Sequence, residues 1–145
     1  MKILVFGLPG SGKTTIAKEI AYHFNIPHYN ADTIREFWDD WDFSIEGRRR
    51  QLERMNMYPF GVLDFVCPLN IYREELNPDV TIWMDTLKKS RYDDTNQLFE
   101  TPRMFNFRIT EWIGQNQLRS SLEDFNPGIK DILPYFREHF QKLVK

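Results

Sequence analysis

Residues 3–16 read Ile-Leu-Val-Phe-Gly-Leu-Pro-Gly-Ser-Gly-Lys-Thr-Thr-Ile, an apolar run followed by a glycine-rich turn and then by a helical pattern. Residues 7–14 fit the spacing G-x-x-x-x-G-K-[ST]. Glycines let the backbone turn sharply and point successive N–H groups inward, which makes a concave anion site. The positive end of the following helix dipole adds to that attraction. The motif is preceded by an expected strand and followed by an expected helix, which is the structural context that a phosphate-binding loop requires. The stretch therefore predicts a phosphate-binding loop (P-loop) for a nucleoside triphosphate rather than a chance glycine-rich turn.

Two side chains of this loop carry the expected chemistry. Lys13 is predicted to reach the β- and γ-phosphates, and the hydroxyl of Thr14 to be a ligand of Mg²⁺. The residues expected to bind the nucleotide are Gly7, Pro9, Gly10, Ser11, Gly12, Lys13, Thr14 and Thr15.

Length and composition indicate a single globular domain over residues 1–145. Aromatic residues make up 15% of the chain, which excludes a disordered chain of low hydrophobicity. The 19 basic and 21 acidic residues nearly cancel, so nothing favours nucleic acid as a partner. The single Cys67 excludes an internal disulfide, and no stretch has the length of a signal peptide core or a membrane span. We therefore expect a soluble, cytoplasmic protein, either a monomer or a homodimer.

Apolar runs alternate with helical patterns along the chain, which predicts a three-layer α/β fold: a parallel sheet with helices on both faces and the site at the carboxyl ends of the strands. Strands are expected near residues 3–6, 28–30, 61–68, 79–85 and 105–110. Helices are expected near 15–24, from an N-cap at Asp32 or Thr33 through Trp38, and near 45–58, 70–76, 116–125 and 129–144.

The predicted helix after Ser44 places an arginine on its apolar face. Ile45, Leu52 and Met55 share one side at helical spacing, and Arg48 falls on that same side. An arginine that faces inward needs an anionic partner, since its unpaired burial is costly. That partner is either a bound substrate or a carboxylate of the fold itself.

Several acidic positions have two interpretations. Residues 39–43 combine three aspartates with two aromatic residues, and we interpret them as a solvated loop in preference to a metal site. Asp64 resembles the acidic residue that ends a Walker B strand, yet it lies inside the apolar run 61–68. A contact to magnesium through water and a purely structural role stay equally open. His23, His28 and His139 form no cluster, and none is proposed as a base or a ligand.

Residues 86–102 are polar and contain Lys88, Lys89 and Arg91. We predict a mobile lid here, because a kinase must exclude water from the phosphoryl group that it transfers. An ordinary surface loop is the alternative.

A P-loop alone does not separate kinases, GTPases and motor ATPases. The sequence lacks the N-K-x-D motif of GTPases and is short for a motor, so a kinase of a small acceptor is favoured. A regulatory module that binds nucleotide without turnover is the alternative from another class.

The chain resembles the adenylylsulfate kinase family in an ordered set of motifs across residues 3–85. The P-loop resembles the family's opening, and residues 30–35 are similar to D-G-D-N-V-R. Residues 43–51 resemble F-S-x-x-D-R-x-E-N, and residues 65–68 stand where the family has F-I-S-P.

This resemblance implies transfer of the γ-phosphoryl group of ATP, with Mg²⁺, to the ribose 3′-hydroxyl of adenylylsulfate on a fold of the nucleoside-kinase type. It implies that Asp32 activates or orients that hydroxyl near the metal. Arg35 and Arg48 match arginines that bind the anionic groups of the acceptor, and Gln51 stands in place of an asparagine that contacts it.

The sequence departs from this family on the acceptor and lid side. Asn30 replaces the first aspartate of D-G-D, Cys67 replaces a serine, and the K-G-L-Y signature of the lid is absent after Asp85. Since the ATP side is intact, phosphoryl transfer from ATP is better supported than adenylylsulfate as the acceptor. A nucleoside, a sugar or a polynucleotide 5′-hydroxyl are the other acceptors considered.

Overall fold

One parallel sheet organises residues 1–110, the part of the chain that this computed structural model describes. The two helices expected within 116–144, and His139, lie outside the described residues. The strands are β1 (Lys2–Gly7), β2 (His28–Asn30), β3 (Gly61–Asp64), β4 (Val80–Met84) and β5 (Phe107–Ile109), and their order in the sheet is β2-β3-β1-β4-β5. Every pair of neighbours is parallel, so all carboxyl ends of the strands lie at one edge. The predicted parallel sheet is confirmed.

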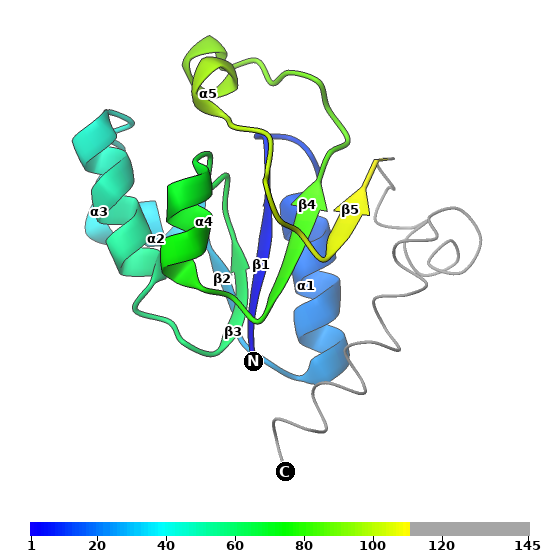
Figure 1. Cartoon of the computed structure of the whole chain (residues 1–145). Coiled ribbons are helices and arrows are strands. Elements are labelled where there is room, and N and C mark those ends of the chain that lie inside the picture. The colour runs from blue at the N-terminus through cyan, green and yellow to red at the C-terminus, as the bar shows by residue number, and fades with distance from the viewer. Residues whose placement is uncertain (111–145) are drawn as a thin grey trace.

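Helices cover both faces of this sheet (Figure 1). Helix α1 (Lys13–Phe24) packs on one face, and α2 (Ala31–Trp38), α3 (Ile45–Met55) and α4 (Asn70–Leu76) lie on the other. A short helix, α5 (Asp93–Leu98), lies beyond the carboxyl edge of the sheet. None of the helices described in residues 1–110 has the length and apolar character to cross a membrane.

The central strand β1 contributes side chains to two separate hydrophobic cores. Because successive side chains of a strand point to opposite faces, Ile3 and Val5 pack with α1, whereas Leu4 and Phe6 pack with the helices of the other face. All four are fully buried. An unbroken apolar run is the pattern expected for a strand covered on both sides, so the sequence predicted β1 correctly.

The largest difference from the sequence prediction is the end of β3. The apolar run suggested a strand over 61–68 with Asp64 inside it, but the strand ends at Asp64. The chain then turns, and Cys67 adopts a φ of 44°, which a strand does not accommodate. Asp64 therefore stands at the carboxyl end of β3, where a Walker B carboxylate belongs.

Helix boundaries differ in smaller ways. Ser44 caps α3 as predicted and accepts from the Gly47 N–H, but α2 is capped by Asn30 and not by Asp32 or Thr33. Helix α3 ends at Met55 rather than at 58, and Ile45 is 75% exposed, so its place on the inward face was wrong. Ile45 is the first residue of α3 and precedes the turns that pack against the rest of the protein. Helical periodicity therefore assigned its side chain to the wrong face.

Gly47 lets the loop 39–43 press against α3. A Cβ at this position would overlap the backbone of Asp42. We expect Gly47→Ala to destabilise the protein by about 1–3 kcal/mol, because the clash outweighs the gain in helix propensity. Urea unfolding would measure it. Glu46→Ala, an exposed change one residue away, is the control and should cost less than about 1 kcal/mol. Equal stability of Gly47→Ala and the native protein would contradict this prediction and show that the loop 39–43 shifts to accommodate the added methyl group without loss of stability.

Candidate functional site

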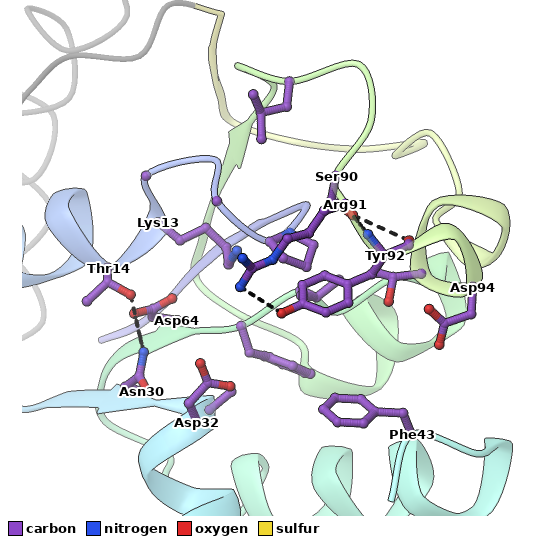
Figure 2. Close-up of a pocket in the computed structure, with 18 of the residues that line it drawn as sticks. Lys13, Thr14, Asn30, Asp32, Phe43, Asp64, Ser90, Arg91, Tyr92 and Asp94 are labelled. Atoms are coloured by element: carbon purple, nitrogen blue, oxygen red, sulfur yellow. Dashed lines mark hydrogen bonds between the residues drawn. The ribbon is translucent and has the colours of Figure 1, made fainter. Parts of the chain in front are cut away.

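A cavity of about 950 Å³ opens at the carboxyl edge of the sheet (Figure 2). Its walls come from five parts of the chain: the P-loop, the start of α2, the loop 39–43 with α3, the end of β3, and the segment 87–95. The described residues that line it are Pro9, Gly10, Gly12, Lys13, Thr14, Thr15, Asn30, Ala31, Asp32, Trp41, Phe43, Arg48, Asp64, Phe65, Val66, Leu87, Lys89, Ser90, Arg91, Tyr92, Asp94 and Thr95. The site predicted at this edge from the fold class therefore has a matching hollow.

The P-loop turns directly from β1 into α1. Gly12 precedes the helix with a φ of 94°, a conformation that favours glycine. The ammonium group of Lys13 donates to the carbonyl of Leu8 at 2.9 Å. Burial lowers the pKa of Lys13, and the nearby carboxylates of Asp64 and Asp32 act in the opposite direction. Both carboxylates are thus near enough to favour the charged form of Lys13.

Asp64 and Asn30 lie beside the Thr14 hydroxyl at the P-loop end of the cavity. The Asn30 amide donates to Thr14 Oγ1 at 3.2 Å and to Asp64 Oδ2 at 2.9 Å. Burial raises the pKa of the Asp64 carboxyl, but hydrogen bonds from His28, Asn30 and Thr14 and the charge of Lys13 outweigh this and hold it below the ordinary value. Asp64 is therefore an ionised carboxylate beside the threonine that the sequence predicts to bind Mg²⁺.

Asp32 faces the cavity from the first turn of α2 (Figure 2). The helix start is fixed because the Asn30 side chain accepts from the Thr33 N–H at 3.1 Å. The Asp32 side chain is exposed and lies near enough to Lys13 to affect its pKa. This position suits a carboxylate that meets a second substrate opposite the phosphates.

Arg48 lines the cavity and is 8% exposed, as its place on the inward face predicts. Its guanidinium donates to the Phe43 carbonyl at 2.9 Å and to Thr95 Oγ1 at 3.1 Å, and Asp94 lies 3.5 Å away. Both interpretations from the sequence therefore have support: Arg48 has partners within the fold and also reaches the site.

Arg35 and Gln51 are not among the described residues that line the cavity. Arg35 is buried, donates to the carbonyls of Asp40 at 2.8 Å and Asp42 at 3.1 Å, and stacks on the Phe43 ring. Gln51 donates to the Ala31 carbonyl at 2.9 Å. Both hold the walls of the site in place, and their contact with an acceptor stays a prediction.

The acidic loop 39–43 is an ion-pair network. Asp40 accepts from Arg50 and Arg54, and Asp42 from Arg50. Hydrogen bonds from these two arginines hold the pKa of the Asp40 carboxyl well below its ordinary value. No group of three or more His, Cys, Asp or Glu side chains is placed to hold a metal ion in the part of the chain that the structure describes. The arginines give the carboxylates of Asp40 and Asp42 partners within the fold.

The segment predicted as a lid lines the cavity through residues 87–95, and its helix α5 meets α3 where Thr95 accepts from Arg48. The Thr86 hydroxyl donates to the Ser11 carbonyl of the P-loop at 2.8 Å. Asn96 accepts from the Ser90 N–H and hydroxyl at 2.8 and 2.7 Å, which braces the turn that carries Arg91 and Tyr92. The segment contains α5 and is more ordered than a plain loop, whereas its closing motion stays a prediction.

Sequence reasoning missed the aromatic lining of the cavity. Trp41, Phe43, Phe65 and Tyr92 all line it, and Trp41, Phe43 and Tyr92 keep about half of their surface exposed. The sequence does contain a sign of this lining, because two aromatic residues stand in the otherwise acidic loop 39–43. A loop that is merely exposed to solvent does not need aromatic side chains. His28 was missed too, and it contacts Asp64.

Comparisons with known proteins identify the type of fold. A family model described as an AAA domain matches residues 6–56. No curated protein matches the chain by sequence. Among solved structures, shikimate kinase from Aquifex aeolicus is similar over 97% of this chain and 99% of its own, with a TM-score of 0.63 and 12% identity.

Two further structures agree. APS kinase CysC from Mycobacterium tuberculosis, in complex with AMPPNP and APS, is similar over 85% of this chain and 95% of its own, with a TM-score of 0.61 and 18% identity. A gluconokinase from Sinorhizobium meliloti is similar over 97% of this chain and 96% of its own, with a TM-score of 0.61 and 16% identity. The three-layer α/β fold of the nucleoside-kinase type is thereby confirmed.

Proposed function

We propose that the protein is an ATP-dependent kinase that transfers the γ-phosphoryl group to a hydroxyl of a small anionic acceptor, with the ribose 3′-hydroxyl of adenylylsulfate as the preferred one. The observation that carries the proposal is the convergence of the P-loop, Asp64, Asp32 and Arg48 on one cavity. The three similar structures are kinases by their descriptions, and one was solved with AMPPNP and APS.

The residues on the phosphate side fit a magnesium nucleotide. Thr14 supplies a hydroxyl oxygen, and Asp64 and Asp32 supply carboxylates that would hold metal-bound water, which are the hard oxygen ligands that Mg²⁺ prefers. When bound, Mg²⁺ neutralises charge on the phosphates. Lys13 and the backbone N–H groups of the loop would stabilise charge on the transferring group.

On the other side of the cavity, Asp32 would hold the acceptor hydroxyl in line with the γ-phosphoryl group. Such positioning is worth several kcal/mol because phosphoryl transfer asks little covalent chemistry of the protein. Arg48 would meet an anionic group of the acceptor. Its bonds to the Phe43 carbonyl and Thr95 fix the direction of its guanidinium.

The aromatic lining favours an acceptor with a planar ring. Trp41, Phe43 and Tyr92 offer exposed ring surface at the acceptor end, and base–aromatic stacking contributes about 1–3 kcal/mol per base. A nucleotide-like acceptor such as adenylylsulfate would stack its base on this surface.

One observation favours a second candidate, a kinase for a different hydroxyl acceptor. Arg35 matches an arginine that binds the acceptor in the adenylylsulfate kinase family, yet here its guanidinium is held by the carbonyls of Asp40 and Asp42. If that arrangement persists with acceptor bound, the anion-binding set differs from the family's.

The test is to offer γ-labelled ATP with a panel of acceptors: adenylylsulfate, nucleosides, sugars and an oligonucleotide with a free 5′-hydroxyl. We expect labelled product from adenylylsulfate. Product from another member alone would support the second candidate. Tight binding of ATP without any labelled product would replace both with a non-catalytic nucleotide-binding module.

Trp41→Ala is expected to raise the KM for the acceptor about tenfold with little change in the KM for ATP, since stacking of this size is lost on the acceptor side only. Steady-state kinetics with each substrate varied in turn would measure it. Trp38→Ala is the matched control, because Trp38 is similarly exposed but is not among the described residues that line the cavity. Equal acceptor KM values for both variants would remove Trp41 from the binding surface.

A further inference from the structure

Asp64 receives two side-chain donors on a single oxygen atom. His28 Nε2 lies 3.0 Å from Asp64 Oδ2, and the Asn30 amide nitrogen lies 2.9 Å from the same atom. An ionised carboxylate only accepts hydrogen bonds, so the Nε2 atom of His28 carries the hydrogen in this contact. The carboxylate is 1% exposed, and these donors compensate for its removal from water.

The register of the sheet explains how both donors reach the same oxygen. Asn30 is paired with Asp64, and His28 is paired with Val62, in the parallel ladder between β2 and β3. Residues two apart on a strand point to the same face, so His28 and Asn30 lie side by side above Asp64. Tyr29 between them packs into the core of the opposite face.

The orientation of the Asn30 amide is fixed from its other end. Its oxygen accepts from the Thr33 N–H at 3.1 Å, which caps α2. Its nitrogen therefore faces Asp64 and Thr14, and its two hydrogens serve one acceptor each. An aspartate at position 30, the residue at the matching place of D-G-D, would bring a second negative charge against Asp64 and would donate to neither partner.

We propose that His28 is a positioning residue which, together with Asn30, holds the carboxylate of Asp64 in the orientation that a Thr14-bound magnesium ion requires. The inference rests on the proposed function, because it concerns the metal side of the same site. The two donors occupy Oδ2 and leave Oδ1 for the metal-bound water or the threonine. Groups that orient a metal-side ligand in this way typically change metal affinity 10- to 100-fold when removed.

The test measures Mg²⁺ affinity by calorimetry with ATP present, and ATP affinity separately in EDTA. We expect His28→Ala to weaken Mg²⁺ binding about tenfold and to leave metal-free ATP binding unchanged, which also reports that the P-loop is folded. His28→Gln should restore most of the affinity, because its amide nitrogen lies at about the same reach as Nε2. His23→Ala, the same change at an exposed histidine of α1, is the matched control.

Asn30→Asp gives an independent test of the orientation. We expect it to weaken Mg²⁺ binding at least as much as His28→Ala, although it adds a negative charge near the metal. Tighter Mg²⁺ binding by Asn30→Asp, or native affinity in His28→Ala, would overturn the inference and leave the proposed function intact. Absence of any ATP binding by the native protein would instead overturn both.

Discussion

Lys13→Ala should reduce kcat on the order of a thousandfold, the loss found when a charged or polar group that stabilises a transition state is removed. The ammonium group enters the cavity at the start of α1, with Asp64 and Asp32 close enough to influence its pKa. Burial disfavours its charge, whereas these carboxylates and the phosphates of a nucleotide favour it. Alanine removes the cation at the place where negative charge develops during transfer.

The measurement is ATP-dependent product formation at saturating substrates. Lys18→Ala is the matched control, since Lys18 is exposed on the same helix and should leave kcat within about twofold of the native value. Lys13→Arg separates charge from shape: a planar guanidinium keeps the charge but not the compact ammonium, so we expect only partial recovery. Turnover at the native rate by Lys13→Ala would remove this residue from the mechanism.

The parts of the fold that sequence reasoning predicted correctly are those decided by neighbours along the chain. The apolar run of β1, the P-loop and the cap at Ser44 each depend on a few consecutive residues, and each is found as expected. Helix α4 was predicted over the same residues, 70–76. Alternation of these elements then predicts a parallel sheet, because such strands need crossover connections.

The parts that were missed depend on contacts between distant residues. The contact of His28 with Asp64 joins positions 36 apart and exists only because β2 pairs with β3. Likewise, helical spacing does not predict that the loop after α2 folds back and places its carbonyls against the Arg35 guanidinium, whereas contact of Arg35 with an acceptor stays a prediction. Spacing along a helix predicts which side chains face the interior, but it does not predict which groups they contact there.

The loop 39–43 shows how these distant contacts serve the site. Arg50 and Arg54 hold its carboxylates, Arg35 holds its carbonyls, and Gly47 lets it lie against α3. Trp41 and Phe43 are therefore presented to the cavity from a rigid support, which reduces the entropy lost when a ring stacks on them. The acidic residues of the loop thus pair with arginines and help to fix two aromatic side chains.

Asp32→Asn should lower kcat about a hundredfold or more while ATP affinity stays close to the native value. Asparagine keeps the size of the side chain and its place in the first turn of α2, but it no longer offers a carboxylate to the acceptor hydroxyl. The proposed ATP side of the cavity consists of the P-loop and Asp64, and Asp32 would add to it only through metal-bound water, so most of the nucleotide contacts stay in place after this change. The loss should therefore appear in kcat and in kcat/KM for the acceptor, whereas the affinity for ATP should not change.

Kinetics with both substrates, together with calorimetry for magnesium and ATP, would separate these effects. Asp39→Asn is the matched control: Asp39 is exposed at the end of the same helix with a φ of 49°, which asparagine also accepts. Asp64→Asn provides the contrast, because it should weaken metal binding as well as kcat. If Asp32→Asn weakened ATP binding at an unchanged kcat, Asp32 would belong to the nucleotide side, and the acceptor hydroxyl would need another partner in the cavity.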